Sequence, residues 1–195
     1  MDTLRAVKRD MKVKAKRLRR EGFVTGNIFG REIEGSIPVQ ISRRDAERAL
    51  RGKSKGSRIL LDVDGEEMNV LIKDISYSAL KYEVDNLDFQ ALVANEKVHS
   101  VAEIVLLNHE KIAAGVLQQT LYEIAYKAYP SALIEKVEID VGDMHVGDTM
   151  EVKDLAIASN PDIDLITHLD SVVATVTETH ITEADEDVAP EEETK

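Results

Sequence analysis

The chain of 195 residues contains no cysteine and no tryptophan. Without cysteine it cannot build a disulfide scaffold, a zinc knuckle or a thiol nucleophile. Three Phe and five Tyr leave few aromatic side chains for a core, so the 43% of hydrophobic residues are mainly Val, Ile, Leu and Ala. The length predicts one large or two small domains, the hydrophobic content suffices to bury a core, and this mix of apolar residues favours strands.

The sequence also lacks a long apolar run. No stretch approaches the roughly 18 apolar residues that a membrane-spanning helix needs. Charges are spread through the first residues, where a secretion signal would have an apolar core. We therefore expect a cytoplasmic protein without a membrane partner.

Acidic residues outnumber basic ones over the whole chain, but the two signs are segregated. Residues 1–58 hold 17 Lys and Arg against 7 Asp and Glu, whereas residues 59–195 hold 8 against 30. The net charge of -12 thus joins a basic part of +10 to an acidic part of -22. This asymmetry is typical of a polyanion-binding face joined to a body that repels anions. The alternative is a charged surface that only contacts solvent, but nine basic residues among the first 20 favour a binding face.

No catalytic or metal-binding pattern stands out. Gly52-Lys53-Ser54 resembles the end of a phosphate-binding loop, but Glu47 stands where the first glycine of that motif belongs. Carboxylate pairs arise by chance in so acidic a chain, and no histidine has metalloprotease spacing. We expect no enzyme, cofactor, metal site or small-molecule substrate. The scattered histidines are His99, His109, His145, His168 and His180.

The first residues predict a short helix and two strands. Lys12–Arg20 predicts the helix, with Gly22 where a C-cap would stand. Phe23–Gly30 is rich in aromatic and β-branched residues and predicts a strand. Ile33–Ile41 predicts a second strand, which Pro38 places at a sheet edge because proline cannot donate to the ladder.

A second helix and a hairpin follow. Ser42 and Asp45 resemble a helix-capping pair, and the helix continues to Gly52. Residues 53–58 (KSKGSR) predict a flexible basic loop. Asp64-Gly65 stands between two β-rich runs and predicts a tight hairpin turn.

The remaining chain is also β-rich but increasingly acidic. Alternating apolar residues predict strands near 122–126, 137–141 and 172–176. Further strands are expected at 84–92 and 98–107. Together these patterns predict a mainly β protein.

The change in charge and apolar pattern along the sequence predicts three parts. Residues 1–92 form a basic β-rich unit, and residues 93–180 form an acidic β domain. Residues 181–195 have no apolar periodicity and predict a disordered acidic tail.

The basic N-terminal cluster is the strongest candidate for a binding site. Its cations are interleaved with Val13, Ala15 and Leu18, which can anchor the segment while long side chains project outward. Arg can fork onto phosphate or guanine edges, and Lys acts as a point charge. The pattern favours a polyanion and does not by itself separate RNA from DNA. The candidate cations are Lys12, Lys14, Lys16, Arg17, Arg19 and Arg20.

Three separated motifs resemble a single bacterial family. KRLRREG followed by FVTGNIFG, which ends in Phe29-Gly30, is similar to the N-terminal signature of large-subunit ribosomal protein twenty-five. VLIKDISYSALKYEVDNLDFQAL, which contains Asp88-Phe89, resembles its second signature. VEIDVGDMHVGDTMEVKDL resembles the C-terminal domain of the longer form, often called general stress protein CTC. The resemblance covers residues from about 4 to 180.

The resemblance implies an N-terminal β-barrel with short helices and a second β domain. It also implies binding of 5S ribosomal RNA within the large ribosomal subunit. The acidic domain could contact neighbouring ribosomal proteins, or it could only keep a basic protein soluble off the ribosome. The matching RNA-binding positions include the cations at Lys14, Lys16, Arg17 and Arg20. On the strands they are Phe29, Gly30, Ser76, Asn86 and Asp88.

Several of these positions depart from the family pattern. Phe29 stands for the usual Tyr, Ser76 for Gln, Asn86 for His and Thr25 for Pro. One alternative is therefore a stress-associated relative that binds the ribosome weakly or conditionally. Another is an enzyme acting on nucleic acid, which the missing catalytic pattern disfavours.

Overall fold

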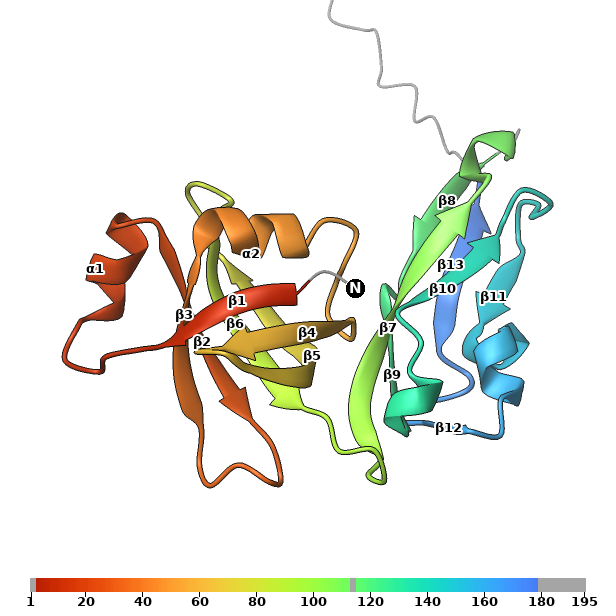
Figure 1. Ribbon diagram of the computed structural model, residues 1–195. Helices are drawn as coiled ribbons and strands as arrows, with labels where there is room; N and C mark the ends of the chain where they lie inside the picture. The colour runs from red at the N-terminus through yellow and green to blue at the C-terminus, as the bar shows by residue number, and fades with distance from the viewer. Residues whose placement is uncertain (1–2, 113–114, 179–195) are drawn as a thin grey trace, which may run out of the picture.

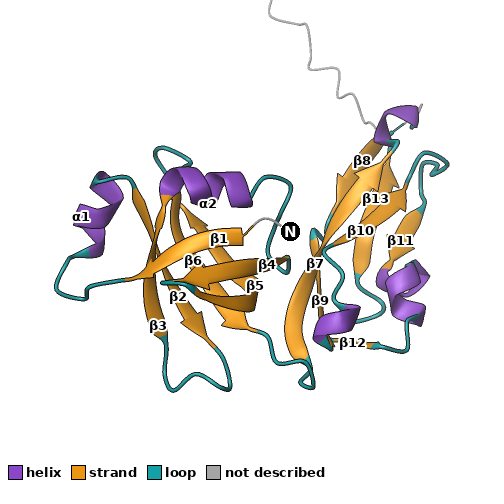
Figure 2. Cartoon of the chain, viewed as in Figure 1, coloured by secondary structure: helices purple, strands orange, loops and turns teal. Residues whose placement is uncertain are grey.

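The computed structural model describes residues 3–112 and 115–178. A closed six-stranded barrel is followed by a second β domain made of two sheets, with short helices at the periphery (Figures 1 and 2). The expected mainly β class is thus confirmed. His180 and the tail expected over 181–195 lie outside the described residues. No helix in the described part is long and apolar enough to cross a membrane.

The barrel has the strand order β1-β3-β2-β6-β5-β4 and closes through parallel pairing of β1 with β4. β2 and β6 are also parallel, and the other neighbouring pairs are antiparallel. Closure leaves the barrel sheet without a free edge. The strands are β1 (Thr3–Lys8), β2 (Phe23–Phe29), β3 (Ile37–Ser42), β4 (Arg58–Val63), β5 (Glu66–Tyr77) and β6 (Val84–Ala91).

Apolar side chains at every second position of the strands fill the inside of the barrel. In β4, Ile59, Leu61 and Val63 are buried while their neighbours are partly exposed. In β6, Leu87 and Phe89 are fully buried. Each such side chain contributes about 1.5–3 kcal/mol relative to an exposed one. The inward positions therefore fix the outward positions, because successive side chains of a strand face opposite sides.

The sequence predicted most barrel strands but missed β1. Leu4 and Ala6 of β1 are buried on either side of the exposed Arg5, so only two apolar positions carry the whole pattern. The tight turn at Asp64-Gly65 is confirmed, with φ of 54° and 93° at the two residues, as a two-residue hairpin loop favours.

Three expectations in this region need correction. β3 begins at Ile37, four residues later than expected, because residues 31–35 form turns and a bend. Pro38 does not lie on an edge strand. The Pro38 carbonyl accepts a hydrogen bond from Arg9 N at 2.9 Å, and Arg9 lies just beyond the end of β1. The nitrogen of Pro38 faces the same side, where the pairing with β1 has already ended, so no hydrogen bond of the sheet is lost. Ser42 precedes the second helix, but its side chain makes no capping hydrogen bond.

Two short helices flank the barrel: α1 (Ala15–Arg20) and α2 (Arg43–Ala49). α1 begins three residues later than expected, because Lys12 and Lys14 precede the helix. Gly22 has φ 88°, which agrees with the expected glycine after the helix end.

The second domain has one four-stranded sheet, ordered β10-β7-β9-β12, and one three-stranded sheet, ordered β11-β13-β8. Its apolar core includes Ile124, Tyr126 and Val173. The buried Tyr126 hydroxyl hydrogen bonds to both N and O of Ile134, each at 2.8 Å. The strands are β7 (Val98–Leu107), β8 (Val116–Gln119), β9 (Glu123–Ala128), β10 (Lys136–Asp140), β11 (Thr149–Glu151), β12 (Ile163–Leu165) and β13 (Val172–Thr177). Single 3-10 turns lie at His109–Lys111, Pro130–Ala132, Val152–Asp154 and Ala156–Ser159.

The barrel contacts the second domain through the segment that joins α2 to β4. Ser57 donates from Oγ to Glu135 at 3.2 Å, and Arg58 donates from Nη1 to the Pro130 carbonyl at 2.7 Å. Lys73 of β5 donates to the His99 carbonyl at 2.8 Å. These hydrogen bonds join residues far apart in sequence and link the two parts at several points.

Close packing accompanies these bonds. Gly56 is buried, and a side chain there would collide with the carbonyl oxygen of Val101 in β7. Leu71 of β5 is fully buried and belongs to the apolar cluster of the second domain. Residues 53–57 do form a loop between α2 and β4, but the expected flexibility is wrong for its second half, because Gly56 and Ser57 are buried between the barrel and the second domain.

Candidate nucleic-acid interface

The basic helix α1 is fixed on the barrel beside β2. Leu18 is its buried residue, in agreement with its expected role as an apolar anchor. Arg43 fastens the helix end, because its Nη2 donates to the Arg19 carbonyl at 2.9 Å and its backbone N donates to the Gly22 carbonyl at 3.0 Å. The cations of this short helix therefore project from a held backbone.

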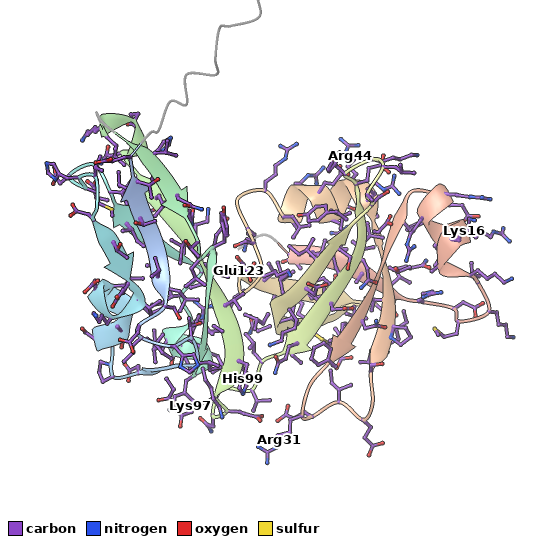
Figure 3. The ribbon with its side chains drawn as sticks, turned by 180° about the vertical axis from the view of Figure 1, so that it is seen from behind. Lys16, Arg31, Arg44, Lys97, His99 and Glu123 are labelled. Atoms are coloured by element: carbon purple, nitrogen blue, oxygen red, sulfur yellow. The ribbon has the colours of Figure 1, made fainter. Side chains whose placement is uncertain are left out.

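Most of the candidate cations are exposed. Figure 3 shows Lys16 on α1, at the end of the barrel away from the second domain. Arg17 forms a 2.8 Å ion pair with Glu21, which raises the pKa of the guanidinium and partly neutralises it. Arg19 is half-buried. The exposed candidates of this cluster are Lys12, Lys14, Lys16 and Arg20, together with the paired Arg17.

A network of polar side chains runs across the outer face of β2 and β6. Asn86 donates from Nδ2 to Asp88 Oδ1 at 3.0 Å, and Asn27 of β2 donates to the same oxygen at 3.3 Å. Thr25 donates from Oγ1 to Asn86 Oδ1 at 3.1 Å. Asn86 and Asp88 therefore face the same side of β6, as residues two apart on a strand do.

The third strand of this face is β5. Ser76 lies opposite Asn86 in the register of β5 and β6, and Asp74 lies opposite Asp88. Ser76 donates to Asp74 at 3.3 Å, and Lys55 forms a 2.8 Å ion pair with Asp74. The hydrogen bond from Lys55 lowers the pKa of Asp74, so this carboxylate stays ionised and is neutralised locally.

Phe29 and Gly30 lie at the far end of β2. Phe29 is half-buried and pairs with Gln90 of β6, on the same outward side as Thr25 and Asn27. A side chain at Gly30 would press against Ala91. The structure therefore brings Phe29, Ser76, Asn86 and Asp88 onto one outward face of the barrel, with α1 beside it, whereas Gly30 lies on the side of Ala91, which packs against the barrel core.

Sequence reasoning missed three residues of this site. Thr25 was noted only as a departure from the family, and Asn27 was not noted, although positions 25, 27 and 29 alternate along one strand. Arg43 was part of a predicted helix, and its link to α1 has no local sequence signal. Its Nη1 also pairs with Glu83 at 2.6 Å, so one side chain joins α1, α2 and the turn before β6.

The candidate chemistry is confined to hydrogen bonding and charge. Within residues 3–112 and 115–178, no three His, Asp or Glu side chains are grouped to hold a metal ion. His99, His109, His145 and His168 are all exposed. The arrangement can position phosphates and donate or accept hydrogen bonds.

Comparison with known proteins identifies the class. The Ribosomal L25p family matches residues 4–89, and the family described as Ribosomal protein TL5, C-terminal domain, matches residues 97–180. A large ribosomal subunit protein bL25 from Bacillus pumilus is 31% identical over 164 residues, which is 82% of this chain and 78% of that protein. One from Listeria monocytogenes is 32% identical over 141 residues, 71% of this chain and 68% of that protein.

A third relative, a bL25 protein from Thermoanaerobacter sp., is 25% identical over 177 residues, with 89% of this chain and 87% of that protein aligned. The barrel, the second β domain and these matches define a ribosomal protein. The chain belongs to the large ribosomal subunit protein bL25 family, in the two-domain form.

Proposed function

We propose that this chain binds 5S ribosomal RNA through α1 and the outer face of β2, β6 and β5, as a structural constituent of the large ribosomal subunit. One observation carries the proposal: the exposed cations of α1 lie beside a face on which Asn86 and Asp88 are held by their neighbours. The proposed RNA-binding part is residues 1–92. The protein would act in the cytoplasm, on the ribosome.

The two halves of the face have different roles. The cations of α1 neutralise phosphates, which supplies affinity without sequence information. The strand face meets the shallow minor groove of an RNA helix, where 2′-hydroxyls and base edges are accessible. Asp88 accepts hydrogen bonds there, and Asn86 and Asn27 each retain a second amide hydrogen to donate.

Asp88 on an RNA-binding face needs a reason, because phosphates repel a carboxylate. Its Oδ1 already accepts two amide hydrogen bonds, and its second oxygen can accept from a 2′-hydroxyl or from a guanine or cytosine amino group. Only a groove that presents such donors compensates the repulsion. Asp88 would therefore select the RNA site more than strengthen binding in general.

The second domain, proposed as residues 93–180, would lie off this RNA contact. Figure 1 shows α1 at the end of the barrel that faces away from it. Its acidic charge would be kept from the phosphates by the contacts of Ser57 and Arg58. Neighbouring ribosomal proteins are its proposed partners.

Hydroxyl-radical footprinting of 5S RNA tests the proposal. The full chain should protect one continuous segment of backbone, and Lys16→Gln combined with Arg20→Gln should remove that protection. The matched control is Lys111→Gln combined with Lys136→Gln, which removes two exposed cations of the second domain. Equal loss in both double variants would contradict the proposed face. Co-sedimentation with large subunits at low and high salt separates constitutive from conditional association.

A further inference from the structure

The loop between β5 and β6 (residues 78–83) exposes large apolar side chains at one end of the barrel. Leu80 is 92% exposed and Tyr82 is 84% exposed. Such exposure of two large side chains in one short loop is typical of a contact site for a partner. This loop directly connects the strands that carry Ser76 and Asn86, so it is continuous with the face described above.

The loop has a defined conformation. Ser78 N donates to the Glu83 carbonyl at 2.8 Å, and Tyr82 N donates to the Ser78 carbonyl at 2.9 Å. Tyr82 has φ 53°, in the left-handed region that bulky residues rarely adopt. The barrel thus holds a tyrosine in an unfavourable backbone conformation while its ring remains in solvent. Backbone strain of this kind is concentrated at sites that bind ligands.

Arg43 links this loop to the basic helix. It pairs with Glu83 at 2.6 Å and donates to the Arg19 carbonyl at 2.9 Å. The loop tip and α1 are therefore held relative to each other by one side chain. The pair also neutralises Glu83, an acidic residue of the loop.

The charge around the tip favours a nucleic acid as the occupant. Lys81 lies between Leu80 and Tyr82, and it is exposed. Figure 3 shows Arg44 at the same end of the barrel, at the start of α2 next to Arg43. An exposed aromatic ring among cations can stack on an unpaired base while the cations neutralise the adjoining phosphates.

We propose that Tyr82 stacks on an unpaired base of the same RNA that the α1 and strand face binds. Leu80 covers the edge of that base, and Lys81 contacts its phosphate. This inference rests on the proposed function, since it adds an aromatic contact to that interface. The barrel would thereby select an RNA in which an unpaired nucleotide adjoins a helical groove, and plain duplex would bind less tightly.

The first test compares variants of the full chain for binding to 5S RNA. Tyr82→Asn should weaken binding roughly 5- to 100-fold, the effect typical of losing one aromatic–base stack. Asn tolerates a left-handed φ, so the melting temperature should not fall. Tyr82→Phe keeps the stacking ring and should bind as the original chain does. Tyr129→Asn, in an exposed tyrosine of the second domain, is the control and should leave affinity unchanged.

The outcomes distinguish a failure of the stacking contact from a failure of 5S RNA binding itself. If Lys16→Gln with Arg20→Gln weakens binding but Tyr82→Asn does not, the stacking inference is overturned and the proposed function stands. If the original chain does not bind 5S RNA at all, both are overturned.

A second test uses the absence of tryptophan in this chain. Tyr82→Trp introduces a single indole whose emission should be quenched when 5S RNA is added. Tyr129→Trp should show no change. Quenching by whole large subunits but not by 5S RNA would overturn the inference in favour of another ribosomal partner.

Discussion

Asn86 and Asp88 are joined by a hydrogen bond of 3.0 Å along one strand, and Thr25 holds the other end of the Asn86 amide at 3.1 Å. The amide therefore has a single orientation, with Nδ2 toward Asp88 and Oδ1 toward Thr25. A recognition group fixed in this way loses little conformational freedom on binding. Asp88 also accepts a hydrogen bond from Asn27, so it stays held when Asn86 is replaced. The roles of Asn86 and Asp88 can therefore be tested by separate mutations.

Asp88→Ala should weaken binding to 5S RNA by about 1–3 kcal/mol, because the RNA donors that it meets would lose their acceptor. It should also reduce discrimination between the cognate RNA and a plain duplex. The side chain lies on the outer face, so the melting temperature should change little. Affinity and melting temperature are measured on the same variant. A lower melting temperature with unchanged affinity per folded molecule would show that Asp88 is only a structural residue.

The control for Asp88 is Asp62→Ala. Asp62 accepts from Gly65 N at 2.8 Å in the β4–β5 turn. Its loss should lower the melting temperature and leave RNA affinity unchanged.

Asn86→His should tighten binding by up to about 1 kcal/mol, in line with one added hydrogen bond. The imidazole adds a flat ring toward the RNA and can still donate to Asp88. Isothermal titration with 5S RNA measures the change. Weaker binding by Asn86→His would show that the hydrogen bond from Thr25 to Asn86 matters more than the ring.

Binding should depend strongly on salt. If about four to six cations engage phosphates, log K should fall with log salt with a slope of roughly -3 to -5. Lys16→Gln combined with Arg20→Gln should make that slope shallower by about 1.5, since each phosphate contact contributes roughly 0.7–0.9. A filter-binding series over several salt concentrations measures both slopes. A flat response of the original chain would mean that the basic face is not the binding face.

The sequence predicted the strands whose apolar residues alternate over several positions. The hairpin at Asp64-Gly65 and the alternating residues of β10 are examples. Local pattern could not reveal β1, because Leu4 and Ala6 are its only buried residues and its pairing partner β4 lies more than fifty residues away. Closure of the barrel depends on this distant pairing of β1 with β4. The closed barrel was therefore expected only from the family resemblance.

The sequence predicted the positive charge of the candidate face, but it did not predict the contacts that hold this face in place. The cations of α1 are adjacent in sequence, so their density was evident. Arg43 lies more than twenty residues from Arg19 and forty from Glu83, and no periodicity connects them. The packing of Gly56 on Val101 was likewise hidden, because the surrounding KSKGSR composition is typical of an exposed loop.

Arg43→Gln should destabilise the chain by about 2–3 kcal/mol, because it removes a partly buried ion pair and a bond to a helix carbonyl. RNA affinity should fall as well, since α1 and the β5–β6 loop would lose their common support. Arg44→Gln is the stability control. It changes an exposed arginine of the same helix and should alter stability by no more than about 0.5 kcal/mol. Equal melting temperatures for the two variants would contradict the role assigned to Arg43.

Residues 1–92 alone should bind 5S RNA as well as the full chain, or better. Removing the rest deletes most of the acidic charge, whose field opposes an approaching polyanion. Stability should fall, because Leu71 packs into the apolar cluster of the second domain and would be exposed. Affinity is therefore compared at a temperature where both proteins are folded. A tenfold loss in the folded fragment would show direct RNA contacts by the second domain.

Gly56→Ala should destabilise the contact between the barrel and the second domain. Gly56 has φ 84°, and a Cβ there would meet the Val101 carbonyl of β7. Gly35 provides a matched control, because its φ is 80° and nothing lies within 4 Å of an added Cβ. Both variants carry a similar backbone strain of about 1 kcal/mol, so the excess loss in Gly56→Ala measures the collision alone. We expect that excess to be at least about 1 kcal/mol, as for overpacking in a close-packed site.

The position of the second domain gives an independent readout of the same change. Small-angle scattering of Gly56→Ala should show a larger radius of gyration than Gly35→Ala, because β7 must move away from residue 56. RNA affinity should be unchanged in both, since α1 lies at the other end of the barrel. Equal destabilisation and equal radii would contradict a fixed contact between the two parts. A loss of affinity confined to Gly56→Ala would instead show that the placement of the second domain matters for RNA binding.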